Sequence, residues 1–313
     1  MSVKIFSGSY SSVLARDIAK NYGSELGRQT LRRFKDGELS FSFDESIRGD
    51  HVFLVQSTCT SAESIVELLL MIDAACRASA MYVTALVPYF GYARQDRKDR
   101  PRVSIGAKLI ANILSAAGAH RLITMDLHAG QIQGFFDIPV DHLDGKVIFF
   151  PYLKKLGLKD ISFVAPDVGA LPRVREYAQY FGAQMAVCDK YRKVANEVSS
   201  IQVIGEVKGR HVILVDDLVD TGVTLCRVSD ALMKKGALTV RAFCTHGIFS
   251  GDAHQMIDDS PMEEVVITDT IPTGENISSK IHVVSTSALF AGAIKNIENH
   301  KSVSSLFLDN LKK

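Results

Sequence analysis

Short runs of β-branched and other apolar residues alternate along the chain with longer stretches in which apolar positions recur at helical spacing. This alternation is typical of a mostly parallel sheet covered by helices, so the predicted fold class is α/β. Because ligands of such sheets bind beyond the carboxyl ends of the strands, we look for functional residues there. The predicted strands are Met1–Ser9, His51–Gln56, Tyr82–Pro88, Arg121–Asp126, Ile161–Ala165, Gln184–Asp189, His211–Val215, Arg241–Thr245, Glu264–Thr268 and Lys280–Val284.

Glycines mark the expected ends of several helices, because glycine tolerates the positive φ angle that a helix terminus often requires. The glycines in question are Gly23, Gly118, Gly182 and Gly236. Two sets of β/α units of related plan follow one another, with a boundary near Asp141–Lys146, after the turn-like Ile138-Pro139. We therefore predict domains at residues 1–144 and 145–313, with the last ~15 residues packing back on the first domain.

Composition narrows the class of protein. The 313 residues carry 36 basic and 35 acidic side chains, for a net charge of +1, which does not suit a nucleic-acid or membrane-surface partner. Apolar runs fall far short of the ~20 residues that span a bilayer, and the start lacks a signal-peptide pattern. The five cysteines are widely spaced, as expected of reduced residues in a cytoplasmic protein without disulfide or zinc.

The segment from His211 to Thr224 is the strongest chemical signal. An apolar run leads into the acids Asp216 and Asp217, then into Asp220-Thr-Gly-Val-Thr224 and a helix. Backbone N–H groups at a helix start and nearby hydroxyls can hold a phosphate, and Gly222 permits close backbone approach. The acids can accept hydrogen bonds from sugar hydroxyls. The alternative is an N-capped helix whose acids only favour the helix dipole.

Three other strand ends carry polar residues. Pro88–Arg100 holds a dense run of donors that suits a polyphosphate or, alternatively, a solvated basic loop. Asp126 and His128 can reach a metal or a phosphate, although a lone histidine is more often a core residue. Asp167 can hold Mg²⁺, which prefers oxygen ligands shared with substrate phosphates, or can simply cap a helix.

Two resemblances rest on these motifs. Asp216–Thr224 resembles the phosphoribosyl-binding loop of the type I phosphoribosyltransferase fold. Over essentially its whole length the chain is similar to the ribose-phosphate pyrophosphokinase family. The residues that carry the second resemblance are Phe34–Glu38, Glu45–Gly49, Tyr92–Asp96, Met125–His128, Gln131–Pro139, Asp189–Val198, Asp216–Thr224, Thr245–Gly247 and Ser302–Phe307. The resemblance implies two related type I phosphoribosyltransferase-like domains, each a mostly parallel sheet flanked by helices.

The family transfers a diphosphoryl group from MgATP to the 1-hydroxyl of ribose 5-phosphate and releases AMP. Carried over, the resemblance implies ATP contacts at Arg94, Gln95, Asp96 and His128, together with Phe34, Asp36 and Glu38 from a neighbouring subunit. It implies a ribose 5-phosphate site at Asp167, Asp216, Asp217, Asp220, Thr221, Gly222, Val223 and Thr224. It assigns Mg²⁺ to His128 and Asp167, catalysis to Lys190 and Arg192 on a mobile loop, and assembly to dimers combined into hexamers.

The resemblance also implies an anion site between subunits, where phosphate activates and ADP inhibits. Its residues are Ser46, Arg48, Arg102, Ser302 and Ser304. The chain departs from the family at three places. Pro101 stands where many members have serine, Ala170 replaces the second glycine of an Asp-x-Gly-Gly turn, and the phosphate loop reads Thr-Gly-Val-Thr where relatives often have Thr-x-Gly-Thr.

Two rival functions share parts of this pattern. A phosphoribosyltransferase shares the Asp216–Thr224 loop, but it leaves the nucleotide-type segments Phe34–Glu38 and Arg94–Asp96 unexplained. A non-catalytic regulatory relative shares the whole chain, but it should have lost catalytic residues or carry an insertion. Lys190, Arg192, His128 and Asp167 are all present, so we favour the enzyme.

Overall fold

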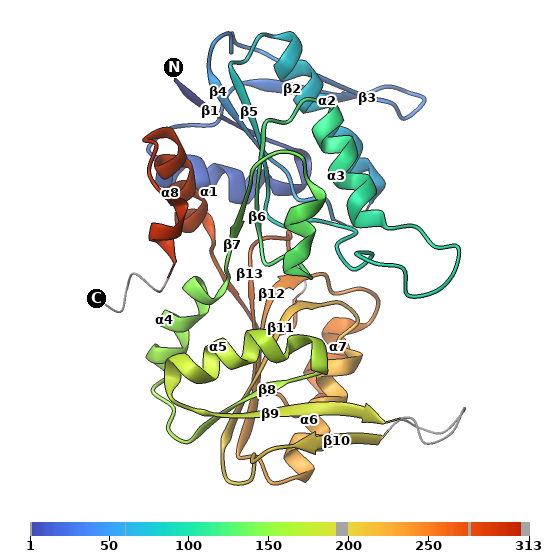
Figure 1. Ribbon diagram of the computed structural model, residues 1–313, viewed down its shortest axis with the longest axis vertical. Helices are drawn as coiled ribbons and strands as arrows, with labels where there is room; N and C mark the ends of the chain where they lie inside the picture. Colours follow the sequence, from blue (N-terminus) through green and yellow to red (C-terminus); the bar gives the residue numbers. More distant parts are fainter. Residues whose placement is uncertain (1, 60, 192–199, 275–276, 308–313) are drawn as a thin grey trace. The chain divides into compact units, whose positions relative to one another are not determined.

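The computed structural model describes residues 2–59, 61–191, 200–274 and 277–307 (Figure 1). These residues divide into two compact units. The first comprises residues up to 145, residues 270–272 and those from 285 onward, and the second comprises 146–269 and 273–284. Each unit is built on a mostly parallel sheet covered by helices, which confirms the predicted α/β class.

The first unit is built on a five-stranded parallel sheet in the order β1-β4-β5-β6-β7. A separate antiparallel hairpin, β2–β3, lies outside this sheet. The strands are β1 (Val3–Ser7), β2 (Gln29–Arg33), β3 (Leu39–Phe43), β4 (His51–Val55), β5 (Tyr82–Val87), β6 (Arg121–Met125) and β7 (Val140–Leu143). The helices are η1 (Ser9–Ser11), α1 (Ser12–Tyr22), α2 (Ala62–Arg77), α3 (Gly106–Ala116), η2 (Gly130–Phe135), α8 (Ser287–Glu298) and η4 (Val303–Leu306).

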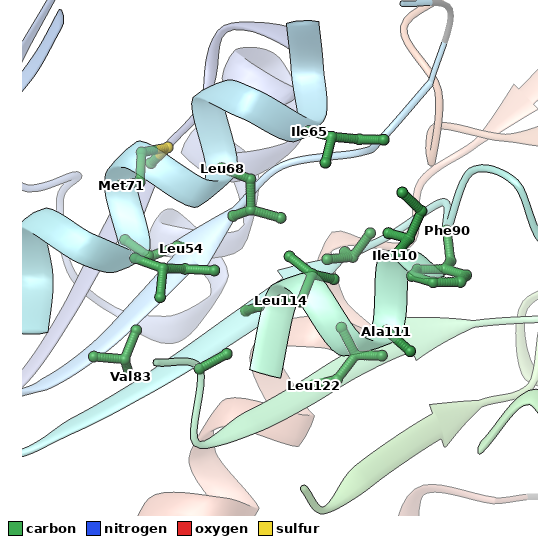
Figure 2. Packing of buried hydrophobic residues seen from close by; sticks show 14 of the residues in the cluster. Leu54, Ile65, Leu68, Met71, Val83, Phe90, Ile110, Ala111, Leu114 and Leu122 are labelled. Atoms are coloured by element: carbon green, nitrogen blue, oxygen red, sulfur yellow. The ribbon is translucent and has the colours of Figure 1, made fainter. Parts of the chain in front are cut away.

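Helices α2 and α3 pack on one face of this sheet (Figure 2). Leu68 and Leu114, one from each helix, join Leu54 and Val83 of the strands in one buried cluster. Phe53, which points to the opposite face from its neighbour Leu54, is also fully buried. Burial on both faces explains why the parallel strands read as continuous apolar runs.

The second unit is built on a seven-stranded sheet in the order β10-β9-β8-β11-β12-β13-β14. All of its pairs are parallel except β9–β10. The strands are β8 (Ile161–Ala165), β9 (Gln184–Tyr191), β10 (Ser200–Ile204), β11 (His211–Val219), β12 (Thr239–Gly247), β13 (Glu264–Thr268) and β14 (Ile281–Val284). The helices are α4 (Lys146–Leu156), η3 (Val168–Ala170), α5 (Leu171–Phe181), α6 (Val223–Lys234) and α7 (Ala253–Asp259).

The two units repeat one plan, with their last helices exchanged. The neighbours β1-β4-β5-β6-β7 correspond in strand order to β8-β11-β12-β13-β14, and the hairpin β2–β3 corresponds to β9–β10. Helix α4 follows the first sheet but belongs to the second unit, where Phe150 contacts Tyr177 of α5 with ring centroids 4.8 Å apart. Helix α8 follows the second sheet but belongs to the first unit, where Ser287 accepts a 2.9 Å bond from Asn21 at the end of α1.

All the strands predicted from the pattern are present, and the four helix-ending glycines have positive φ angles. Three details of the prediction were wrong. Val140–Leu143, which was not predicted as a strand, forms β7 and pairs with β6; the polar residues Asp141 and His142 interrupt its apolar pattern. β11 continues to Val219 because its ladder with β12 extends to Gly247, so Asp216 lies within the strand. β9 continues to Tyr191 through its pairing with β10.

None of the helices in the part of the chain that the structure describes is long and apolar enough to cross a membrane. The five cysteines are free thiols, four of them buried.

A buried histidine is expected to make the stability of the first unit depend on pH in the acid range. His51 is 4% exposed, stacks on Phe53 and shares a 2.9 Å hydrogen bond with Thr84 Oγ1. Burial, with smaller contributions from Arg121 and His120, lowers the pKa of His51 to about 4. Because an unfolded histidine titrates near 6.5, the unfolded state takes up a proton between these values and the folded state does not. We expect the free energy of unfolding to fall by up to about 3 kcal/mol between pH 6.5 and pH 4.

Urea unfolding curves across this pH range test the expectation. A His51→Gln variant, which cannot titrate, should show a shallower pH dependence than the unchanged chain. An equally steep dependence would assign the acid sensitivity to other groups.

Candidate active site

The carboxyl edge of the second unit's sheet gathers acidic side chains from neighbouring strands. Asp216 and Asp217 lie near the end of β11, and Asp167 follows the adjacent strand β8. Asp217 is buried, and Asp216 Oδ1 accepts a 2.9 Å bond from the Asp217 N–H. Burial, then the charges of Asp217 and Asp167, raises the pKa of Asp216 well above its usual range. This edge therefore favours a ligand that brings positive charge or hydrogen-bond donors.

The loop between β11 and α6 has the shape that a phosphate site requires. Gly222 caps α6 with φ of +75°, a left-handed conformation that favours glycine. The next turn begins with Val223 and Thr224, whose N–H groups stand at the helix start where the dipole favours an anion. Two backbone bonds from the β12–α7 loop hold the segment, from Ile248 N to Val219 O at 2.8 Å and from Ser250 N to Asp220 O at 3.2 Å.

The Asp167 turn is a helix cap, as its alternative interpretation predicted, and it also lies at the site. Asp167 caps η3 and accepts bonds from Gly169 N (2.8 Å) and Ala170 N (3.2 Å), both at Oδ1. Its side chain is nevertheless exposed, and its charge acts on Asp216. Ala170, which stands where the family has glycine, is buried.

One of the two expected catalytic cations, Lys190, lies near the end of β9. Its backbone is in the strand, paired with Ile201 of β10, whereas the resemblance placed it on a loop. The other, Arg192, lies outside the described residues.

In the first unit, the corresponding edge of the sheet presents the expected nucleotide segments. Arg94 and Gln95 are exposed in the loop after β5, which turns at Tyr92 with φ of +62°. Asp96 accepts a 3.2 Å bond from Gln131 Nε2. His128 is exposed shortly after β6.

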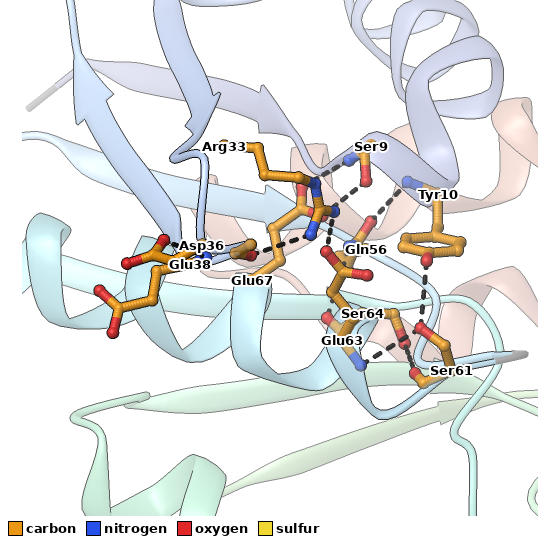
Figure 3. Close-up of polar contacts among 11 residues, drawn as sticks. Ser9, Tyr10, Arg33, Asp36, Glu38, Gln56, Ser61, Glu63, Ser64 and Glu67 are labelled. Carbon is orange, nitrogen blue, oxygen red and sulfur yellow. Dashed lines mark hydrogen bonds and ion pairs between the residues drawn. The ribbon is translucent and has the colours of Figure 1, made fainter.

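The tip of the β2–β3 hairpin carries the other three expected ATP contacts, of which Figure 3 shows Asp36 and Glu38. Phe34 is 55% exposed, unusually open for an aromatic residue, and Asp36 and Glu38 are exposed beside it. The turn is closed by bonds from Phe34 N to Glu38 O at 2.8 Å and from Glu38 N to Asp36 Oδ1 at 3.2 Å. The tip thus offers an aromatic face and two carboxylates outward.

In the first unit, the positions that correspond to the acid pair are occupied by neutral residues whose side chains bond within the protein. After β4, the positions that correspond to the acids are the buried, neutral Gln56 and Ser57. Ser57 donates to Thr270 O at 2.5 Å, and Gln56 accepts from Tyr10 N at 3.1 Å (Figure 3). The buried carboxylate of Glu67 accepts two bonds from Ser9, where the second unit has the Asp167 turn. A sugar phosphate is therefore better suited to the second unit.

The residues of the expected anion site lie in three segments of the first unit. Ser46 and Arg48 line an open pocket of about 510 Å³ together with Phe41, Phe43 and Arg77. Ser302 and Ser304 share a 2.7 Å hydrogen bond near η4. Arg102 is exposed in the loop before α3, with φ of +65°.

The carboxylate oxygens at the carboxyl edge of the second unit's sheet are of the kind that Mg²⁺ prefers. The described residues contain no cluster of three or more His, Cys, Asp or Glu side chains arranged to hold a metal ion. Mg²⁺ rarely uses such a cluster, because it is usually held by one or two carboxylates, water and substrate phosphates. Burial and the nearby carboxyl groups of Asp217 and Asp167 raise the pKa of Asp216, and this gathering of acids supports a cation at the second unit's edge.

Comparison with known proteins identifies the family. A family model described as the N-terminal domain of ribose phosphate pyrophosphokinase matches residues 3–118, and one described as the phosphoribosyl synthetase-associated domain matches residues 172–308. Curated ribose-phosphate pyrophosphokinases from Porphyromonas gingivalis and Campylobacter jejuni are 49% and 47% identical, over 97% of this chain and 97% and 99% of their own. The crystal structure of phosphoribosylpyrophosphate synthetase from Mycobacterium smegmatis matches with a TM-score of 0.91 and 36% identity, over 96% of this chain and 100% of that one.

The α/β plan repeated in the two units, with two acids and a glycine-capped helix start at one strand edge, is that of a protein of the phosphoribosyl-handling class. The chain belongs to the ribose-phosphate pyrophosphokinase family, and it is an enzyme that transfers diphosphate groups. The match over nearly the whole chain removes the phosphoribosyltransferase alternative.

Proposed function

We propose that this enzyme transfers the diphosphoryl group of MgATP to the 1-hydroxyl of ribose 5-phosphate, giving 5-phosphoribosyl 1-diphosphate and AMP for nucleotide biosynthesis. The observation that carries the proposal is the second unit's edge, where the partly buried Asp216 and the buried Asp217 lead into a glycine-capped helix start. A vicinal diol and a phosphate on one small sugar satisfy these two features together. The free thiols of the chain suit a cytoplasmic location.

Ribose 5-phosphate binds to the second unit in this proposal. The 5-phosphate accepts hydrogen bonds from N–H groups and hydroxyls in the loop Asp220-Thr221-Gly222-Val223-Thr224. The carboxylates of Asp216 and Asp217 accept bonds from the ribose hydroxyls, which orients the sugar and its 1-hydroxyl. Asp167 lies beside them and would contribute an oxygen ligand to a bound Mg²⁺ ion.

ATP binds to residues of the first unit, Arg94, Gln95, Asp96 and His128, and His128 is the second proposed Mg²⁺ contact. Phe34, Asp36 and Glu38 complete the nucleotide site from a neighbouring copy, so the active assembly is a homo-oligomer of dimers combined into hexamers. The exposure of the hairpin tip supports this role, because an aromatic face and two acids pointing outward suit an adenosine of another copy.

Catalysis in this scheme rests on positioning and charge, because phosphoryl-type transfer requires little covalent work from the protein. Lys190 and Arg192 place positive charge next to the diphosphoryl group while it is transferred. The Mg²⁺ ion supplies neutralisation of the polyphosphate charge when bound.

Isotope placement tests the reaction. With ATP labelled in the γ-phosphate, the label should appear in the sugar product, and with ATP labelled in the α-phosphate it should remain in AMP. Label from the γ-phosphate in a sugar that lacks the β-phosphate would mean monophosphoryl transfer and would contradict the proposal.

The phosphate loop gives a sharper prediction about Gly222. An alanine there has room, with its nearest neighbours at 3.6 Å or more, but it must hold φ near +75°. This conformation costs an L-residue about 1 kcal/mol, so we expect the KM for ribose 5-phosphate to rise about fivefold.

Gly209 provides the matched control. It has φ of +68°, open space around it and a place in the turn before β11. Gly209→Ala should bear the same backbone strain and leave both KM values unchanged. A similar KM in the Gly222→Ala variant and the unchanged enzyme would remove the loop from the sugar-phosphate site.

Inorganic phosphate and ADP are the proposed effectors. Phosphate activates and ADP inhibits at the site formed by Ser46, Arg48, Arg102, Ser302 and Ser304. Two observations support an anion there, the arginines that line the pocket and the paired serine hydroxyls. Pro101 removes one hydroxyl from this neighbourhood relative to many members, so we expect phosphate activation to be weaker than with serine at that position.

A further inference from the structure

We infer that Arg33 is a positioning residue that holds the hairpin tip, Phe34–Glu38, in its nucleotide-binding geometry. The inference rests on the proposed role of the tip in binding ATP. It adds two residues, Arg33 and Glu63, that the sequence motifs did not single out.

The contacts of Arg33 reach in two directions (Figure 3). Its Nη1 donates a 3.0 Å hydrogen bond to the carbonyl of Gly37, inside the turn. Its Nη2 forms an ion pair with the Glu63 carboxylate on α2. One planar guanidinium therefore joins the turn of the hairpin to a helix of the main body of the unit.

Glu63 is itself held in place by the start of α2. Its N–H donates to Ser61 Oγ, the N-cap of the helix, at 3.2 Å. A carboxylate in the first turn is also favoured by the helix dipole. The partner of Arg33 thus sits at a point whose backbone is fixed by capping.

The bonds within the tip close the turn, but apart from the bridge through Arg33 the tip is exposed and the hairpin that carries it lies outside the main sheet. A two-stranded hairpin outside a larger sheet is only marginally stable by itself. Strand β3 packs on α2, but Phe34, Asp36, Gly37 and Glu38 are all exposed. Gly37 has φ of +98°, and the bond from Arg33 to its carbonyl fixes the orientation of this peptide.

The energetic consequence is preorganisation rather than stability. An ion pair with side chains 54% and 35% exposed adds little to the free energy of unfolding. Holding three ligand-binding side chains in one arrangement before ATP arrives lowers the entropy lost on binding. The effect should therefore appear in ATP affinity and not in thermal stability.

The experiment compares Arg33→Ala, Arg33→Lys and Glu63→Gln with the unchanged enzyme. We expect Arg33→Ala to raise the KM for ATP, and the dissociation constant of ATP measured by calorimetry, about fivefold. Arg33→Lys keeps the positive charge but loses the planar guanidinium that makes two contacts at once. Glu63→Gln leaves the hydrogen bond from Arg33 to the Gly37 carbonyl intact. Both variants should have smaller effects. The KM for ribose 5-phosphate, the melting temperature and the sedimentation coefficient should not change.

Lys146→Ala is the matched control, because it removes a partly exposed ion pair with Glu176 in the second unit. It should leave both KM values unchanged. Unchanged ATP binding in Arg33→Ala, an equal rise in both KM values, or dissociation of the assembly would each overturn the inference. Failure of the unchanged enzyme to bind ATP would instead overturn the proposed function on which the inference rests.

Discussion

Replacement of Lys190 by alanine is expected to lower kcat by about 10³-fold or more, the scale of effect that a transition-state cation has in phosphoryl transfer. A cation that meets charge developing in the transition state stabilises that state more than the bound substrates, so the loss should fall on kcat, with smaller changes in the KM values. Initial rates of AMP formation at saturating substrates measure it.

The control for this variant is Lys190→Arg, which keeps a cation at the end of β9 and should recover part of the activity. Calorimetric titration with ribose 5-phosphate should give the same affinity for Lys190→Ala as for the unchanged enzyme. A fall in kcat of less than tenfold would show that Lys190 does not act on the transition state.

At a pH above the folded-state pKa of Asp216, where its carboxylate is charged, replacement of Asp216 by asparagine should reduce kcat/KM for ribose 5-phosphate by roughly 10²-fold, since charge-assisted hydrogen bonds to the ribose hydroxyls are lost. The KM for ATP should stay close to its original value. Steady-state kinetics with each substrate varied in turn measures this difference. A similar loss toward both substrates would contradict the assignment of Asp216 to the sugar.

The same substitution should stabilise the folded chain once the pH rises above the usual titration range of an aspartate, with the gain developing up to the raised folded-state pKa of Asp216. Burial and the charges of Asp217 and Asp167 raise the pKa of Asp216, so the folded state holds a proton that the unfolded state has released. Stability from this group is present at low pH and is lost as pH rises through the folded-state pKa. The neutral amide of the Asp216→Asn variant cannot ionise, so this loss should disappear. The melting temperature of the variant should therefore exceed that of the unchanged enzyme by a margin that grows with pH.

Much of the fold could be predicted from the sequence, because strands that are buried on both faces of a parallel sheet consist of continuous apolar runs. Strand β7 was not predicted, because Asp141 and His142 interrupt its apolar pattern. Its backbone hydrogen bonds to β6 stabilise it as a strand. The exchange of α4 and α8 could not be predicted, since an amphipathic stripe shows that a helix packs but not against which sheet.

The residues of the candidate site could likewise be predicted only in part. Asp216, Gly222 and the hairpin tip stand in local motifs, so their residue types and spacing pointed to them. Arg33 and Glu63 are 30 residues apart and lie on exposed faces, where a charge usually means only contact with solvent. Their pairing depends on the placement of the hairpin against α2, which no local pattern encodes.

The most direct test of the proposed reaction is to incubate the purified chain with MgATP and ribose 5-phosphate and to quantify AMP and 5-phosphoribosyl 1-diphosphate together, with Lys190→Ala in parallel. We expect equimolar formation of both products by the unchanged enzyme and their loss in the variant. ADP as the nucleotide product, or no product from folded and assembled enzyme at any phosphate concentration, would contradict the diphosphoryl transfer.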